Sequence, residues 1–344
     1  MRLGLYIFAA LTLMGIAAVL TYTVNPNNYI VEFMGINFNF PVAVWMILPM
    51  GVLLLFTAIH MLFYSLKGYF TLKKWQKDAA TLEDALYWSL INEPKEQKYA
   101  IDEFKSSAVL LGKSSVEVLD AVDGLAPRLS KALNLINKIK SGEYVDLKEN
   151  KMSKVFSEGN QYLVKNRVNR LQKDPEFVEE VMKSSSQYSK QVQKQALDIF
   201  ARKETFFKAR KYAKIFDAEN LHVMLARAVH EEDMGLNAEI LNDFVDALKL
   251  SCVDFVKIAN VTKKVFSPTQ NLALFKGYQK KYPKAQEAYL YLLFDYELLD
   301  EASAYLDEHE EHEFLKFRAF NELKKSHKKF KLEELINVNT ICSK

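Results

Sequence analysis

Two long runs without a charged side chain dominate the first fifth of the chain. They cover residues 3–24 and 33–66, so that Glu32 is the only formal charge between Arg2 and Lys67. A helix of about 20 apolar residues crosses the hydrocarbon core of a bilayer, and each run is long enough to do so. The pattern therefore predicts two transmembrane helices.

The residues between the two runs predict a short connection outside the membrane. Residues 1–66 are interpreted as a two-helix transmembrane module in which residues 22–41 form the loop. An NPNN turn precedes an alternating stretch that starts at Tyr29, which predicts a small strand pair or an interfacial aromatic segment. A cleaved signal peptide is disfavoured, because the first run is longer than the usual h-region and no small-x-small site follows it.

Basic residues predict the orientation of this module. They flank the outer ends of the two runs, while the connection between the runs contains no Lys or Arg. Trp45 lies near the start of the second run, where an aromatic side chain suits the membrane–water boundary. The flanking basic residues are Arg2 on one side and Lys67, Lys73, Lys74 and Lys77 on the other. By the positive-inside rule, both termini are expected in the cytoplasm.

The same region resembles a known family. The pattern consists of an Asn-rich turn, an N-x-x-x-V-x-F segment, a Pro that opens the second helix and a basic exit helix. These residues are Asn27, Asn28, Val31, Phe33, Pro41, Lys67, Lys73 and Lys74. Residues 1–80 resemble the lipopolysaccharide assembly protein A family, although that family often has several glycines in its second helix and this run has only Gly51. The resemblance implies a two-pass protein of the bacterial inner (cytoplasmic) membrane that works with a membrane-anchored repeat protein.

The remainder of the chain has the composition of a soluble domain. Apolar residues make up 49% of the chain and charged residues 26%, with a net charge of +3, which disfavours disorder. Acidic and basic residues alternate, so no nucleic-acid partner is expected. Cys252 and Cys342 lie far apart without CxxC spacing, which favours reduced cytosolic thiols.

Glycine and proline punctuation predicts that this remainder is almost wholly helical. The scarce Gly and Pro residues fall between segments with helical periodicity, and no sustained strand-like alternation follows the second run. Residues 67–140 are interpreted as a membrane-proximal helical section that continues the second helix. Residues 141–174 have the lowest apolar density and are interpreted as a polar seam, followed by a distal helical-pair repeat domain over residues 175–344.

Pairs of short apolar stripes define the distal section. Small alanines beside large apolar side chains allow helices to approach closely, and the sequence YELLDEASAYL resembles the second helix of a tetratricopeptide repeat. No strict repeat period is apparent, since the interval from Ala209 to Ala302 is not a multiple of the length of such a repeat. The residues expected to hold the pairs together are Ala288, Leu292, Leu299, Ala302 and Leu306. The predicted fold is all-α, with a cytoplasmic α-solenoid of tetratricopeptide type or, alternatively, a helical bundle.

Three motifs that could carry chemistry have simpler interpretations. Gly112-Lys113-Ser114-Ser115 lacks the first glycine and the preceding strand of a phosphate-binding loop, so a turn that ends a helix is favoured. The spacing from His309 to His312 is not that of HExxH, which favours a solvated acidic helix end. His222 and His230 are interpreted as packing and solvated residues. No catalytic residue, cofactor or metal is predicted, and the chain is not expected to be an enzyme.

The sequence leaves two classes of function open. The favoured class is a membrane-anchored adaptor or scaffold that recruits or regulates envelope proteins, with lipopolysaccharide assembly as the process that the resemblance implies. An assembly factor or chaperone for another inner-membrane complex, such as a flagellar or secretion machine, is the alternative within this class. The other class is an enzyme or sensor with a site invisible in the sequence. Membrane lipid and another inner-membrane or cytoplasmic protein are the expected partners.

Overall fold

The computed structural model describes residues 3–120, 122–338 and 340–342. Among these residues it contains sixteen α-helices, five short 3₁₀ helices and one two-stranded sheet. The predicted all-α class is therefore confirmed. Contacts within the chain divide it into two compact units, one up to Ala132 and one from Leu133 onwards, and each is described by itself.

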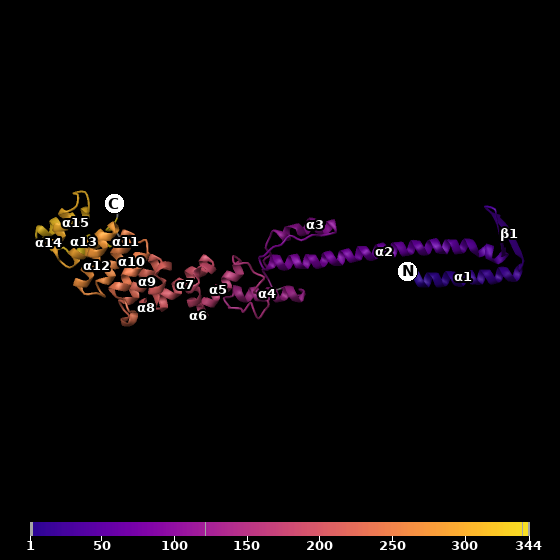
Figure 1. The fold of residues 1–344 in the computed structure, drawn as a ribbon, viewed down its shortest axis with the longest axis horizontal. Coiled ribbons are helices and arrows are strands. Elements are labelled where there is room, and N and C mark those ends of the chain that lie inside the picture. The colour runs from indigo at the N-terminus through magenta and orange to yellow at the C-terminus, as the bar shows by residue number, and fades with distance from the viewer. Residues whose placement is uncertain (1–2, 121, 339, 343–344) are drawn as a thin grey trace. The chain divides into compact units, whose positions relative to one another are not determined.

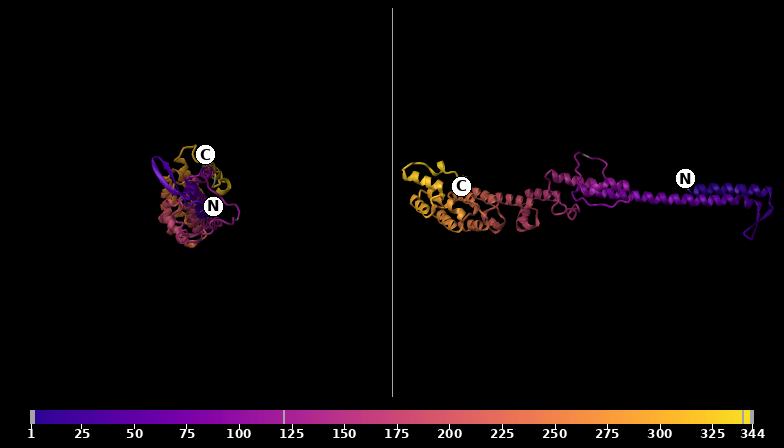
Figure 2. Two further views of the ribbon diagram at one scale, coloured as in Figure 1. Left: turned by 90° about the vertical axis from the view of Figure 1, so that its right-hand side faces the viewer. Right: turned by 90° about the horizontal axis from the view of Figure 1, so that it is seen from above.

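Two long apolar helices form most of the first unit. α1 (Leu3–Val24) and the first half of α2 (Val42–Leu90) pack side by side and run in opposite directions, as Figures 1 and 2 show. The predicted extension of the second helix past residue 66 is confirmed, because α2 continues without interruption for 49 residues and includes Pro49. The first uncharged run thus corresponds to α1, and the second contains β2 as well as the amino-terminal half of α2.

An antiparallel hairpin connects the two helices, as one of the two sequence interpretations predicted. β1 (Asn28–Phe33) pairs with β2 (Ile36–Pro41), and the register places Phe33 opposite Ile36 next to the turn. Both turn residues have positive φ angles, 52° at Met34 and 84° at Gly35, as a tight two-residue hairpin turn requires. The indole N–H of Trp45 donates a 3.1 Å hydrogen bond to the carbonyl oxygen of Tyr29, which fixes the hairpin to the start of α2.

A short helical segment packs against the far end of α2. It comprises α3 (Asp102–Ala108) and the 3₁₀ helix η1 (Val109–Gly112). The side chain of Asp78, which is 1% exposed, accepts the backbone N–H groups of Ala100 and Ile101 at 2.9 and 2.8 Å. A buried carboxylate on α2 therefore fixes the point at which α3 begins, since it satisfies N–H groups that the helix itself leaves unpaired.

The following helix links the two units, and the second unit holds all later elements. α4 (Pro127–Lys140) begins in the first unit and ends in the second. The residues interpreted as a polar seam belong to the second unit and include α5 (Gln161–Lys173), whose Leu171 is 1% exposed. The later α-helices are α6 (Pro175–Lys183), α7 (Lys190–Lys203), α8 (Phe206–Ala209), α9 (Ala218–Ala228), α10 (Ala238–Ala247), α11 (Cys252–Thr262), α12 (Pro268–Lys281), α13 (Gln286–Asp295), α14 (Leu299–Asp307), α15 (Leu315–Lys325) and α16 (Leu332–Leu335).

Side-chain caps explain why these short helices begin where they do. Ser251 and Asp254 form a reciprocal capping box at the start of α11, which satisfies two backbone N–H groups at once. Pro follows the cap of α6 and of α12, where its fixed φ angle suits the first helical position. The cap side chains that accept backbone N–H groups are Asn160, Asp174, Ser189, Asp217, Asn237, Ser251 and Ser267.

The helices of the second unit pack in a series. α5 packs on α7, α7 on α9, α9 on α11 and α11 on α13, so each contact skips one helix of the chain. The starts of the last three are evenly spaced along the sequence, at Ala218 for α9, Cys252 for α11 and Gln286 for α13. One continuous hydrophobic core, from Val164 to Ile341, runs through the unit. The order of packing therefore follows the order of the chain.

A disulfide joins two distant parts of the second unit. Cys252 at the start of α11 and Cys342 near the carboxyl end are bonded, with 6.0 Å between their Cα atoms. The expectation of two reduced, separate thiols is therefore wrong for this structure. The sequence separation of the two cysteines is 90, and their proximity arises because residues such as Ile336 and Ile341 pack into the core, which cysteine spacing alone does not reveal.

Candidate functional site

The two apolar helices present an uncovered hydrophobic surface. No residue of α1 is buried, and its Phe8 is 72% exposed. The most apolar window of α1 is 0% buried and that of α2 only 6%, whereas the core helix of a soluble protein would be covered. By length and composition, both helices are able to cross a membrane.

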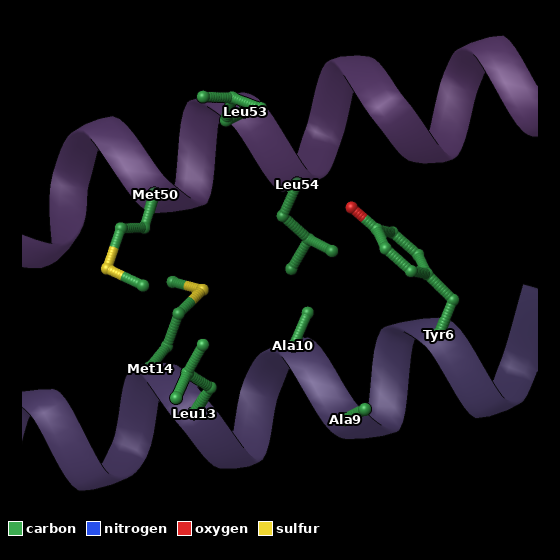
Figure 3. Close-up of a pocket in the computed structure, with 8 residues that line it drawn as sticks. All are labelled: Tyr6, Ala9, Ala10, Leu13, Met14, Met50, Leu53 and Leu54. Carbon is green, nitrogen blue, oxygen red and sulfur yellow. The ribbon is translucent and has the colours of Figure 1, made fainter.

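A shallow apolar groove of about 400 Å³ lies between α1 and α2. Figure 3 shows Leu54 pointing toward Ala10 and Met50 toward Met14 across this groove, with Tyr6 at one end. A Cβ atom at Gly51 would lie 3.4 Å from the terminal methyl group of Met14, which is a van der Waals contact with the end of a flexible side chain, so the packing of the two helices does not require glycine there. Apart from the hydroxyl of Tyr6, the side chains that line the groove are apolar, which suits contact with hydrocarbon rather than chemistry.

The residues of α2 that were predicted to lie at membrane boundaries flank its apolar part, which ends at residue 66. Trp45 is partly buried, and its ring packs edge-on against Phe40 with 5.9 Å between centroids. Arg2 lies outside the described residues. The basic residues of α2 are all exposed to solvent: Lys67, Lys73, Lys74 and Lys77.

The Gly-Lys-Ser-Ser motif forms a turn that is fastened to α2, as predicted. It begins at the last residue of η1, and its Lys113 forms an exposed ion pair with Glu96 at 3.2 Å. The hydroxyl of Ser89 donates to the carbonyl oxygen of Ser114 at 2.6 Å. A Cβ atom at Gly112 would lie 3.1 Å from the Cα atom of Glu96, so the glycine is explained by close backbone approach. The motif therefore contributes packing rather than a cradle for phosphate.

The structure puts most of the predicted helix-pair residues in the core. Leu299 is partly buried and contacts the core, at the start of α14. The other four are 0–2% exposed: Ala288, Leu292, Ala302 and Leu306. α13 packs on α14, and α14 on α15, so these side chains lie where consecutive helices meet.

The histidines singled out in the sequence have structural contacts. His222 Nε2 lies 2.9 Å from Asp254 Oδ1, and this pair joins α9 to the capping box of α11. His309 Nδ1 lies 2.8 Å from the carbonyl oxygen of Tyr305, and its ring is 4.5 Å from the Tyr305 ring. His312 pairs with Glu310 at 3.3 Å in an exposed position. These contacts do not gather the histidines into one site.

A partly buried group of charged side chains that sequence reasoning missed joins the end of α11 to α13 and α16. Lys263 Nζ lies 2.9 Å from Asp295 and 3.5 Å from Glu333, and it donates to the hydroxyl of Tyr291 at 3.0 Å. Burial opposes the charge of Lys263, but the hydrogen bonds to Asp295 and Tyr291 more than offset it, so the pKa of Lys263 lies above its usual range. Asp295 is 32 residues away in the sequence, and no local pattern could have paired the two.

Two phenylalanines of the second unit are exposed, and Phe207 is more exposed than Phe330. Phe207 in α8 is 77% exposed, while its neighbour Phe206 is 0% exposed. Exposed aromatic side chains are enriched at protein–protein contacts, although a single one is common on any surface. Sequence periodicity cannot separate these adjacent phenylalanines, because α8 is only four residues long.

The described residues therefore contain an uncovered apolar surface and a well-packed helical unit. Among them, no group of three or more His, Cys, Asp or Glu side chains is placed to hold a metal ion. In comparisons with protein-family models, with curated proteins and with solved structures, nothing matches this chain.

Proposed function

We propose that this protein is a membrane-anchored helical adaptor that recruits or regulates another protein of the bacterial envelope. The observation that carries the proposal is the contrast between the two units. The first unit exposes two apolar helices, in which no residue of α1 is buried, while the second unit has one continuous hydrophobic core. An uncovered helix pair suits a bilayer, and a packed helical unit in the same chain suits protein binding.

The order of helix packing supports a repeat architecture of tetratricopeptide type. The even spacing from Ala218 to Cys252 to Gln286 equals the length of such a repeat, about 34 residues. Each of the three helices that start there packs on the next, as the equivalent helices of stacked repeats do. Solenoids of this kind commonly bind partners along an extended surface, so we favour an adaptor over an enzyme or a sensor.

The process served by this adaptor rests on the resemblance of residues 1–80. Asn27, Val31, Phe33 and Pro41 resemble the lipopolysaccharide assembly protein A family, and the β1–β2 hairpin contains or borders all four. In that family, a two-helix protein works together with a membrane-anchored repeat protein. We propose that this chain joins two such parts in one polypeptide of the inner membrane, with a role in lipopolysaccharide assembly.

The orientation gives the first testable prediction. An Asn27→Cys variant is expected to react with a membrane-impermeant thiol reagent in intact cells whose outer membrane has been permeabilised. Asn27 is exposed between α1 and β1, and the positive-inside rule puts this connection outside the cytoplasm. Labelling is measured by mass shift of the purified protein. The unmodified chain, in which Cys252 and Cys342 are disulfide-bonded, gives the background.

A Glu149→Cys variant is the matched control for this experiment. Glu149 is exposed, and it follows both apolar helices, so it is expected to react only after the inner membrane is broken. Labelling at Glu149→Cys but not at Asn27→Cys in intact cells would reverse the orientation. Labelling of both variants only after lysis would show that the β1–β2 connection does not lie on the far side of the inner membrane.

Adaptor function is tested by photo-crosslinking from the exposed aromatic position. A photoreactive phenylalanine analogue at Phe207, which is 77% exposed, is expected to crosslink one defined envelope protein in living cells. The same analogue at Lys276, an exposed position of α12, is the control. A Phe207→Ala variant should then lose co-purification of that protein from native membranes by about tenfold, since an interface aromatic commonly contributes about 1–2 kcal/mol or more.

Two outcomes would contradict the adaptor proposal. One is that Phe207 and Lys276 give the same set of crosslinks, which would indicate random contacts. The other is that a fragment beginning at Gly68 restores full function to cells lacking the protein, because an adaptor depends on the high local concentration that its anchor provides.

A further inference from the structure

A cavity of about 690 Å³ lies near the carboxyl end of the second unit. Its walls come from the end of α13, from α15 and from the segment that leads into α16. Cavities of about 300–1,000 Å³ are typical of small-molecule sites. This cavity has no part in the adaptor function proposed above, so its contents are a separate question.

The lining is rich in cations. The segment from Lys324 to Lys331 reads KKSHKKFK and contains five lysines and one histidine without an acidic residue. Five of these cationic or titratable side chains line the cavity: Lys324, His327, Lys328, Lys329 and Lys331. His327 to Lys331 are exposed to solvent, so their charged ends are free to turn toward a ligand.

Three carboxylates line the same cavity, and one lysine outside the lining offsets part of their charge. Asp295 and Glu333 both pair with Lys263, at 2.9 and 3.5 Å. Glu297 is the third carboxylate that lines the cavity, and Lys263 does not contact it. Together, the four lining lysines and Lys263 supply five positive charges against these three carboxylates, so the cavity carries an excess of two positive charges. Such an excess in a concave site concentrates anions.

The backbone holds the cationic segment in a defined shape. The N–H of Lys328 donates to the carbonyl oxygen of Leu323 at 3.0 Å. The N–H of His327 donates to the carbonyl oxygen of Lys324, also at 3.0 Å. His327 has a φ angle of 58°, which is uncommon for a residue other than glycine. The closed turn at the end of α15 therefore keeps Lys324 and Lys328 near each other.

Aromatic side chains give the cavity an apolar wall. Phe294 and Phe320 line it and pack edge-on with 5.5 Å between their ring centroids. The amino group of Lys324 lies 5.4 Å from the centre of the Phe320 ring, so this lysine is held over an apolar surface. Phe330 adds a ring that is 42% exposed. A ligand with an anionic group and an apolar part fits both features.

We propose that this cavity binds a phosphate-bearing anion. Lysine ammonium groups bind phosphate as point charges with several donors, and four of them line this cavity. The phosphate group belongs either to a soluble phosphate compound or to the headgroup of an anionic phospholipid. The proposal stands independently of the adaptor function and of the client protein.

Isothermal titration of the full chain in a neutral detergent tests this proposal. The soluble probe is inorganic pyrophosphate, and the lipid probe is short-chain phosphatidylglycerol below its micelle concentration. Short-chain phosphatidylcholine, whose phosphate charge is balanced by its own ammonium group, is the reference without net charge. At least one of the two anionic probes is expected to bind, with an affinity that falls as salt is raised. Binding of pyrophosphate alone identifies a soluble source, and binding of phosphatidylglycerol alone identifies a headgroup. Binding of both identifies the phosphate group as the shared determinant.

Charge-removing variants localise the binding. Lys328→Gln/Lys329→Gln is expected to weaken it by about tenfold or more, because two of the four lining ammonium groups are removed. Lys276→Gln/Lys280→Gln removes two lysines of α12 that do not line the cavity, and it is expected to bind like the unmodified chain. Circular dichroism verifies that both variants fold.

Three results would overturn the proposal. The first is that neither anionic probe binds. The second is that the α12 variant loses as much affinity as the cavity variant, which would indicate general surface charge. The third is that phosphatidylcholine binds as tightly as phosphatidylglycerol, which would assign the binding to the apolar surface rather than to the lysines.

Discussion

Replacing Ala302 by aspartate is expected to unfold the carboxyl-terminal part of the second unit. Ala302 lies in α14 and is 0% exposed, and α14 packs on both α13 and α15. Folding would transfer a carboxylate in this position from water into the hydrophobic core. Ala302→Asp should therefore lower the free energy of unfolding by at least about 3 kcal/mol. Urea unfolding of the full chain in detergent, followed by circular dichroism, measures this loss.

Ala304→Asp is a matched control on the same helix. Ala304 is exposed, and an aspartate there should change the free energy of unfolding by about 0.5 kcal/mol or less. Burial raises the pKa of a carboxyl group, so part of the loss in Ala302→Asp should be recovered as the pH falls to about 5, where the neutral form is populated. Equal unfolding midpoints for the two variants would contradict the placement of α14.

Truncation of Phe206 is expected to have an effect of similar size, and truncation of Phe207 almost none. Phe206 packs edge-on against Phe244 at 5.8 Å, and Phe244 against Phe216 at 5.0 Å. Phe206→Ala should therefore lower the free energy of unfolding by about 3–5 kcal/mol. Phe207→Ala removes a side chain that is 77% exposed. This variant should change the free energy of unfolding by about 0.5 kcal/mol or less.

The two adjacent positions separate folding from binding in one experiment. Chemical unfolding of both variants is compared with co-purification of the crosslinked envelope protein. Phe207→Ala is expected to unfold like the unmodified chain and yet lose the partner. A loss of stability in Phe207→Ala that matches that of Phe206→Ala would mean that both rings are part of the core, and the surface role of Phe207 would fail.

Local features of the sequence were sufficient to predict the long helices, and they gave the strand pair as one of two interpretations of the connection. The absence of charge over residues 3–24 and 33–66 located α1 and the start of α2, because length and apolarity depend on no distant partner. The connection beginning at Asn28 has strand-like alternation and a Gly at the turn, and it forms β1 and β2. Helical periodicity predicted an all-α second unit for the same reason.

The even spacing of three helix starts was missed because the positions compared in the sequence lie in different structural settings. Ala209 ends α8, a helix of four residues, whereas Ala302 lies within α14. The regular interval becomes visible only when the starts of α9, α11 and α13 are aligned. Asp217 and Ser251 cap the starts of α9 and α11, whereas α13 follows the 3₁₀ helix that begins at Pro283. Because these three starts differ in residue type, their even spacing cannot be recognised from the sequence.

Contacts between distant residues could not be predicted. Asp78 accepts the N–H groups of Ala100 and Ile101, and Lys263 binds Asp295, yet nothing near either acidic residue in the sequence marks its partner. The Cys252–Cys342 disulfide is a third example. Such pairs depend on how whole helices pack, and packing is decided by many side chains together rather than by a local motif.

The unbroken length of α2 has a mechanical consequence. A helix of 49 residues is about 74 Å long, whereas a bilayer core takes up only about 30 Å of it. With its amino-terminal part in a membrane, α2 behaves as a stiff lever, and a tilt of about 10° moves its other end sideways by about 13 Å. Because bilayer thickness influences helix tilt, Asp78 and Ser89, which hold the α3 segment on this lever, would move as the membrane thins or thickens.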